Sequence, residues 1–326
     1  MNINEFDIED LIKNRVPMTE KDEYMHDWGQ FPKYHNESWY FNFIDRPNKV
    51  YLVTRLSFHM DKNKARLLAL LVVDDKSKTY FKEVPLEKMP ENWEFDKSLK
   101  YYCIKPMEEW RVTFEDKRMK LDVNLKGRFP VFNSAEVEDP DEFIKKYGKE
   151  VFQVAIQEHY EQPTIATGTL ELKRKGEVYE TRNIEGFGNR DHSWGIRHWV
   201  QIDNWNWAAA QFEDNTVIIA RSELMGISIQ FGVIYSKGKE NRIIDKIDVT
   251  TETEADGKKP VSSTFVLTDR QGKQITIKSK TIFSIYLPLP SRTGKTEIYE
   301  QVAIFDWDGK EGDGISEYLM STRDNE

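Results

Sequence analysis

Hydrophobic and polar positions alternate in short segments along most of the chain, from SWYFNFID (38–45) onward. In the later segment TGTLELKRKGEVYETRNIEG, Leu170 and Leu172 fall on one face of an extended strand, and Glu171 and Lys173 fall on the other. Side chains of a strand point alternately to its two faces, so this pattern predicts β-strands with one buried face.

Turn residues separate these segments at regular intervals. Lys175-Gly176 predicts a hairpin turn, because glycine tolerates the positive φ that such turns require. Asp61 and Asn63 predict another turn, between YLVTRLSFHM and ARLLALLVV. The same alternation of strand and turn returns in four later segments, 205–220, 231–249, 263–287 and 297–319.

Few segments favour helix, and no strand–helix–strand alternation is present. The candidates are residues 3–14 and 139–148, the second with Asp139 or Asp141 as its N-cap and Gly148 at its end. Evenly spaced hairpins predict an all-β protein of closed or nearly closed antiparallel barrels, or a sandwich. A chain of 326 residues is long for one core, so we expect two domains, 1–185 and 186–326.

Charge and composition exclude several classes of function. The net charge is −9 without a clustered basic face, which argues against nucleic acid as a partner. Cys103 is the single cysteine, so no intramolecular disulfide forms, and a lone thiol suits a reducing compartment. The longest apolar run, 67–73, has the length of a strand, and the acidic, mixed N-terminus is unlike an export signal. These features predict a cytoplasmic protein without an integral membrane segment, and leave its oligomeric state open.

The candidate chemistry is concentrated in EGFGNRDHSWGIRHW (185–199). Its G-x-G lacks the third glycine and the following helix of a dinucleotide site, and no P-loop, H-E-x-x-H or C-x-x-C occurs. A metal site would need His192 and His198 with Asp191, joined by His26 or His35, and this spacing matches no established ligand pattern. We therefore predict neither metal nor cofactor.

Two interpretations of the charged residues stay open. If 189–193 is extended, Arg190 and His192 share one face, and Asp191 and Ser193 share the other. The glycines before and after suggest instead a bulge or bend that lets several of these side chains converge. In the structural interpretation, Asp191 accepts hydrogen bonds from an arginine such as Arg197, in a buried ionic corner. In the catalytic one, Asp191 or His192 protonates a double bond and tryptophan faces stabilise the carbocation. Arginines would lower the pKa of Asp191, which makes His192 the better donor.

The run GFGNRDHSWGIRHW, followed by WNWAAAQFED, resembles the G-x-G-x-R-D-H-S-W-G-x-R signature of the AttH-like and hydroxyneurosporene synthase (carotenoid hydratase) group. ESWYFNFID, EQPTIATGTLEL and GDGISEY are similar to the same group, so the resemblance spans nearly the whole chain. It implies two lipocalin-like β-barrel domains packed together, each able to enclose an apolar ligand. It also implies hydration of an isoprenoid double bond, or the pericyclic or terpenoid cyclisation of distant relatives.

The sequence thus predicts an acid–base enzyme, a hydratase or cyclase, acting on a hydrophobic isoprenoid-like small molecule. The alternative is a non-catalytic carrier of apolar ligands, in which the charged motif is a structural corner. The candidate catalytic residues are Arg190, Asp191, His192 and Arg197. The candidate substrate-binding residues, some in a cleft between the barrels, are Trp28, His35, Glu37, Trp39, Tyr40, Trp194, Trp199, Trp205 and Trp207.

Overall fold

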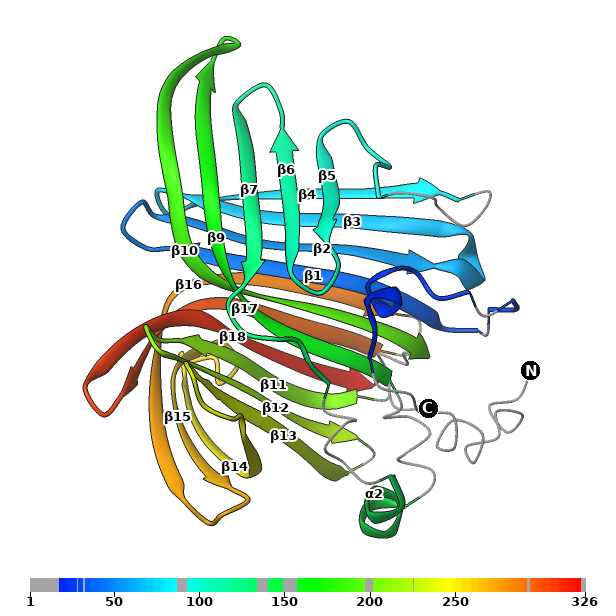
Figure 1. The fold of residues 1–326 in the computed structure, drawn as a ribbon, viewed down its shortest axis with the longest axis vertical. Coiled ribbons are helices and arrows are strands. Elements are labelled where there is room, and N and C mark those ends of the chain that lie inside the picture. Colours follow the sequence, from blue (N-terminus) through cyan, green and yellow to red (C-terminus); the bar gives the residue numbers. More distant parts are fainter. Residues whose placement is uncertain are drawn as a thin grey trace. The chain divides into compact units, whose positions relative to one another are not determined.

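The computed structural model describes residues 18–27, 29–31, 33–86, 93–133, 140–148, 157–196, 202–224, 226–291 and 294–323. The chain divides into two compact units, Met1–Arg197 and His198–Glu326. Both are built from antiparallel strands (Figure 1). Among the described residues, no helix has the length and apolar character needed to cross a membrane.

Unit 1 is a curled ten-stranded sheet with the order β4-β3-β2-β1-β10-β9-β7-β6-β5, in which β8 pairs with β9. Within the described residues, no backbone pairing joins β4 to β5, although the Tyr80 hydroxyl on β4 donates to Asp96 just before β5. The strands are β1 (His35–Asp45), β2 (Val50–His59), β3 (Lys64–Val73), β4 (Lys76–Pro85), β5 (Leu99–Lys105), β6 (Glu109–Glu115), β7 (Met119–Gly127), β8 (Phe132–Asn133), β9 (Gln157–Arg174) and β10 (Glu177–Ile196).

The central strands β1 and β10 approach each other closely where β10 carries two glycines. A Cβ on Gly186 would lie 2.2 Å from the carbonyl oxygen of Ile44, and one on Gly188 would lie 2.0 Å from that of Asn42. These glycines of the G-x-G sequence therefore permit strand contact in the middle of a long curved strand (Figure 1). No helix follows them in β10, which agrees with the rejection of a dinucleotide site.

The short elements follow the local sequence. A 3-10 helix, η2 (Glu20–Glu23), begins with a capping box of Thr19 and Asp22. The predicted turns are confirmed, since Asn63 after η3 (Met60–Lys62) has a φ of 50° and Lys175-Gly176 has φ values of 54° and 90°. The predicted helix at 139–148 is α2 (Pro140–Tyr147), followed by Gly148 at a φ of 90°. The predicted helix at 3–14 lies outside the described residues.

Unit 2 is a closed eight-stranded barrel in sequential order. Its apolar core contains Ala208, Ile219, Phe265 and Phe305. The predicted fold class is confirmed: the protein is all-β with a two-domain lipocalin-like fold, one unit closed and the other curled. The strands are β11 (Ile202–Gln211), β12 (Asn215–Leu224), β13 (Ile227–Ser236), β14 (Arg242–Thr253), β15 (Pro260–Asp269), β16 (Gln274–Ser291), β17 (Gly294–Trp307) and β18 (Lys310–Arg323).

The predicted domain boundary, between residues 185 and 186, falls inside β10. This strand pairs with β1 from Phe187 to Ile196, so the chain remains part of the first sheet beyond residue 185. The division into compact units comes after Arg197 instead. The RDHSWG sequence therefore belongs to unit 1.

Candidate acid–base site

The inner face of β1 and β10 brings the residues of the motif together. Trp39 lies opposite His192, and Phe41 lies opposite Arg190. Arg190 and His192 share this face, as the alternation predicted, and both are fully buried. Ser193 points to the other face, where its Oγ lies 3.2 Å from that of Ser38.

Residues 19–26, including η2, contact this inner face. The indole Nε1 of Trp39 donates to the main-chain oxygen of Glu23 over 3.1 Å. His192 Nδ1 lies 2.8 Å from the main-chain oxygen of Asp22. Two ionic groups, one built around Glu23 and one around Glu37, are formed where these residues meet the sheet.

The first group is the Glu23–Arg190 hub, in which both side chains are buried. Arg190 Nη1 and Nη2 donate to the two carboxylate oxygens over 2.7 and 3.0 Å. Three further donors reach the same carboxylate: the Tyr160 hydroxyl at 2.6 Å, the Trp110 indole at 2.9 Å and the Met107 main-chain N–H. The carboxylate of Glu23 is therefore saturated with hydrogen bonds.

The charges of the hub are fixed. Burial raises the pKa of Glu23, but the charge and hydrogen bonds of Arg190 outweigh it, so this pKa lies below its usual value. Burial raises the pKa of Tyr160 well above its usual value. No group of the hub titrates near neutral pH. A buried ionic corner does exist, but the acid that pairs with Arg190 is Glu23 rather than Asp191.

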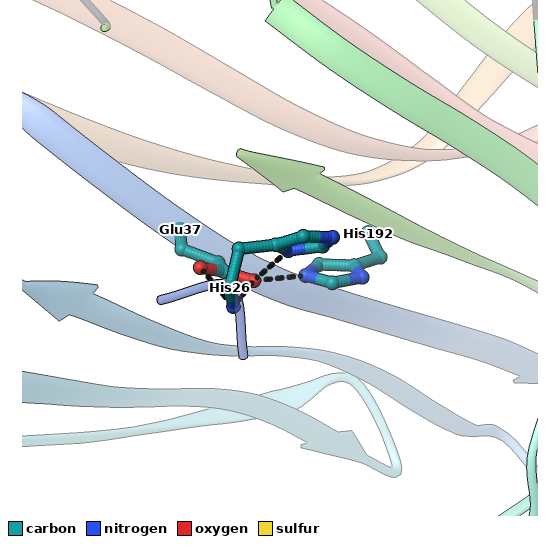
Figure 2. A group of neighbouring side chains, drawn as sticks. All are labelled: His26, Glu37 and His192. Carbon is teal, nitrogen blue, oxygen red and sulfur yellow. Dashed lines mark hydrogen bonds and ion pairs between the residues drawn. The ribbon is translucent and has the colours of Figure 1, made fainter. Parts of the chain in front are cut away.

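The second group is the His26–Glu37–His192 cluster (Figure 2). A single oxygen, Glu37 Oε1, lies 2.8 Å from His26 Nδ1 and 2.9 Å from His192 Nε2. The His26 main-chain N–H also donates to this carboxylate, at 3.2 and 3.1 Å from its two oxygens. Glu37 and His192 have no exposed side-chain area, whereas 23% of the His26 side chain is exposed.

Unlike the hub, this cluster has an unsatisfied hydrogen-bonding contact when His192 is neutral. A carbonyl oxygen only accepts, so His192 Nδ1 must carry a proton toward Asp22. In the neutral ring, Nε2 then presents a lone pair to an oxygen of Glu37 that can only accept. One more proton on His192 or on Glu37 relieves this contact, so the cluster is built to take up and release a proton.

The pKa shifts follow this arrangement. Burial lowers the pKa of His26, but its hydrogen bonds to Glu37 and Asp22 outweigh burial and raise it overall. Burial dominates at His192, whose pKa lies below its usual value. Burial raises the pKa of Glu37, yet the two histidines bring it below its usual value. These opposite shifts make His26, rather than His192, the ring that binds a proton more readily.

Aromatic rings surround the cluster. Trp39 stacks on His192 and Trp194 stacks on His26, each with ring centroids 4.2 Å apart. The indole of Trp194 is 8% exposed and lies next to the one partly exposed ring of the cluster. The structure thus brings together four of the candidate residues, Glu37, Trp39, His192 and Trp194.

Among the described residues, these same three form the one group that could hold a metal ion. Their ligand atoms all lie within 4.8 Å of one another. This set differs from the one weighed in the sequence, because it combines His26 and His192 with Glu37. Its two shortest contacts, 2.8 and 2.9 Å, are ordinary hydrogen-bond lengths. The absence of a metal remains a prediction.

The remaining predicted site residues are not members of the two groups. His35 lies two positions before Glu37 on the same face of β1, and its ring contacts Phe31 edge-on at 4.8 Å between centroids. Tyr40 and Asp191 lie on the outer-facing positions of β1 and β10. Trp205 and Trp207 alternate with Asn206 and Ala208 on β11, so they lie on the outer face of the unit 2 barrel. Trp28, Arg197 and Trp199 lie outside the described residues.

Sequence reasoning missed several side chains at the two groups. Asp22, Glu23, Trp110 and Tyr160 were not singled out, and His26 was considered only as a metal ligand. The capping pattern T-E-K-D at 19–22 was the one local signal that η2 would be ordered. Nothing local to Glu23 indicates a partner 167 positions away.

Residues 19–322 match the family described as Domain of unknown function (DUF7064). The chain belongs to this family. No curated protein matches the sequence.

Solved structures show the same fold at low sequence identity. An AttH protein from Nitrosomonas europaea is 14% identical, with a TM-score of 0.65 over 94% of this chain and 97% of that one. Kievitone hydratase from Nectria haematococca is 12% identical, with a TM-score of 0.59 over 94% and 93% of the two chains. CghA, solved with Sch210972, is 11% identical, with a TM-score of 0.59 over 89% and 88%. The DUF7064 chain thus shares its fold with these proteins, one of which is named AttH, and this likeness concerns the fold alone.

Proposed function

We propose that this protein is an acid–base enzyme, a hydratase or cyclase, that acts on a double bond of a small, hydrophobic, isoprenoid-like molecule. The observation that carries the proposal is the contact of two histidine rings with one carboxylate oxygen of Glu37, at 2.8 and 2.9 Å. A structural neighbour that is itself named a hydratase supports the choice of reaction.

We assign to His26 the direct transfer of a proton to the substrate. Its ring is the member of the cluster that reaches solvent, and it stacks on the apolar face of Trp194. Its Nδ1 is directed to Glu37, while Nε2 has only a long contact of 3.3 Å with Asp22. The proton on Nε2 is therefore the one available for transfer.

Glu37 and His192 act through His26 as positioning residues. In hydration, the His26 imidazolium protonates one carbon of the double bond, and water attacks the cationic carbon. The proton that this water loses returns to the cluster, so the enzyme is unchanged after one cycle.

The test uses prenylated phenols and enones in deuterated water, with solvent deuterium at the double bond measured by mass spectrometry. Wild-type protein should incorporate deuterium, and His26→Gln should reduce the rate by about 10² to 10⁴, the usual contribution of a general acid. His159→Gln is the matched control, because His159 also contacts a glutamate, Glu161, at 3.0 Å. It should retain the wild-type rate.

Two results would contradict the proposal. One is a His26→Gln protein that is as active as wild type. The other is a wild-type protein that binds members of this panel and leaves all of them unchanged, which would favour the carrier.

A further inference from the structure

The His26–Glu37–His192 cluster directs three possible ligand atoms to one point. His26 Nδ1 and His192 Nε2 lie 2.8 and 2.9 Å from Glu37 Oε1 (Figure 2). These lengths suit hydrogen bonds, and they equally suit ligands at right angles around one ion, which lie about 2.9 Å apart when the bonds to the ion are about 2.0 to 2.1 Å. Distance alone therefore does not separate a shared proton from a shared metal ion.

The second nitrogen of each ring contacts the same residue, Asp22. His192 Nδ1 lies 2.8 Å from its main-chain oxygen, and His26 Nε2 lies 3.3 Å from its carboxylate. A main-chain oxygen and an ionised carboxylate only accept, so in a neutral ring these nitrogens carry the proton. Both neutral rings then present a lone pair to Glu37. Histidines that bind a metal have this arrangement, in which the other ring N–H donates to a carboxylate or main-chain oxygen and fixes the ring.

The charge of the cluster also suits a divalent cation. With both rings neutral, Glu37 contributes one negative charge, and Asp22 contributes a second on the far side of His26. The neighbouring hub adds no net charge, because Arg190 offsets Glu23. A proton balances one of the two negative charges, whereas a divalent ion balances both.

The cluster is open to an ion on one side. Glu37 and His192 have no exposed side-chain area, whereas the side chains of His26 and Asp22 are 23% and 24% exposed. An ion therefore enters from the side of His26. Three protein ligands leave room for a further one on the ion, and solvent on this side can supply it.

We propose that the His26–Glu37–His192 cluster binds one divalent transition-metal ion, of the zinc and copper class that prefers imidazole, in competition with its transferable proton. The ion takes the place of the proton, which leaves to solvent. Because His26 is then a neutral ring held by the ion, it no longer acts as a general acid, and the ion inhibits the enzyme. This inhibition rests on the proposed function, whereas the binding does not. The ion is a regulatory ligand, so the predicted absence of a resident metal is unaffected.

The experiment is electron paramagnetic resonance of the full chain with one equivalent of Cu²⁺, because nitrogen hyperfine structure counts the imidazole rings on the ion. Wild-type protein should give one species with two nitrogen ligands. His26→Gln should weaken binding by more than about a hundredfold, since losing a ligand costs more than losing a group that orients one. Glu37→Gln should weaken it in the same direction. His159→Gln is the matched control, because His159 contacts Glu161 at 3.0 Å and neither belongs to the cluster.

A Cu²⁺ spectrum that is the same in wild type and His26→Gln would show an adventitious ion only and overturn the site. So would a wild-type species with fewer than two nitrogen ligands. The competition is tested with Zn²⁺, which should stop deuterium incorporation by wild-type protein until EDTA removes it, and Zn²⁺-loaded protein that remains active would overturn it. A protein that binds Cu²⁺ through both rings but incorporates no deuterium would contradict the proposed function and support the metal site.

Discussion

The hub and the cluster are two buried ionic groups, and both combine residues of β10 with residues of the same short N-terminal segment. They differ in whether each hydrogen-bond acceptor has a donor. At Glu23, five donors from four residues meet one carboxylate, and every charge is fixed. At Glu37, a neutral His192 leaves one contact between two acceptors. Burial alone therefore does not distinguish an anchor from a reactive site, whereas the count of donors and acceptors does.

The largest effect should come from breaking the hub. Arg190→Met leaves the Glu23 carboxylate buried without its counter-charge, and we expect a loss of about 3 to 5 kcal/mol in the free energy of unfolding, measured with urea. Arg111→Met breaks the pair with Asp122, in which both side chains are partly exposed, and should cost about 1 kcal/mol or less. Equal losses in the two variants would show that Arg190 is not an anchor.

Glu37→Gln should change titration more than stability. Without the carboxylate, His26 loses the interaction that raises its pKa, so its titration moves to lower pH. Activity that requires the His26 imidazolium is present below the pKa of His26 and lost above it, so the alkaline limb of the pH profile moves in the same direction. Nitrogen-15 NMR of the imidazole rings measures this shift, and an unmoved His26 titration would refute the link to Glu37.

The smallest effect is expected at Asp191. Asp191→Asn removes a charge from the face of β10 opposite His192, so the titrations of His26 and His192 should remain as in wild type. The same nitrogen-15 experiment checks this. A displaced His192 titration would place Asp191 back among the proton-handling residues and weaken the assignment of His26.

The fold was predictable because its signals are local. The alternation of Leu170, Glu171 and Leu172 indicates the strand that became β9, and Lys175-Gly176 indicates the turn that follows it. For 189–193 the extended alternative placed Arg190 and His192 on one face, and the bulge that the glycines suggested does not occur there, because the register with β1 and β9 is continuous. The partners of these two residues were not predictable, because Glu23 and Glu37 lie 167 and 155 positions earlier, and pairing over such distances depends on strand order.

Strand order also decides where Trp205, Trp207 and the predicted boundary lie in the structure. Trp205 and Trp207 are close to the motif in sequence, but they begin the barrel of the second unit and alternate with its core residues. The boundary at residue 185 was placed between two halves of similar strand pattern, but β10 continues past it and stays paired with β1 as far as Ile196.

The separation between Glu23 and Arg190 in the sequence also sets the delay between their synthesis on the ribosome. A ribosome adds about 5 to 20 residues per second, so these 167 positions correspond to roughly 8 to 33 seconds of synthesis. During this interval, strands β1 to β9 are synthesised, while Arg190 and His192 on β10, the partners of Glu23 and Glu37, do not yet exist. The nascent protein thus acquires the neighbouring strands of its sheet first, and its ionic centre is assembled only when β10 enters between β1 and β9.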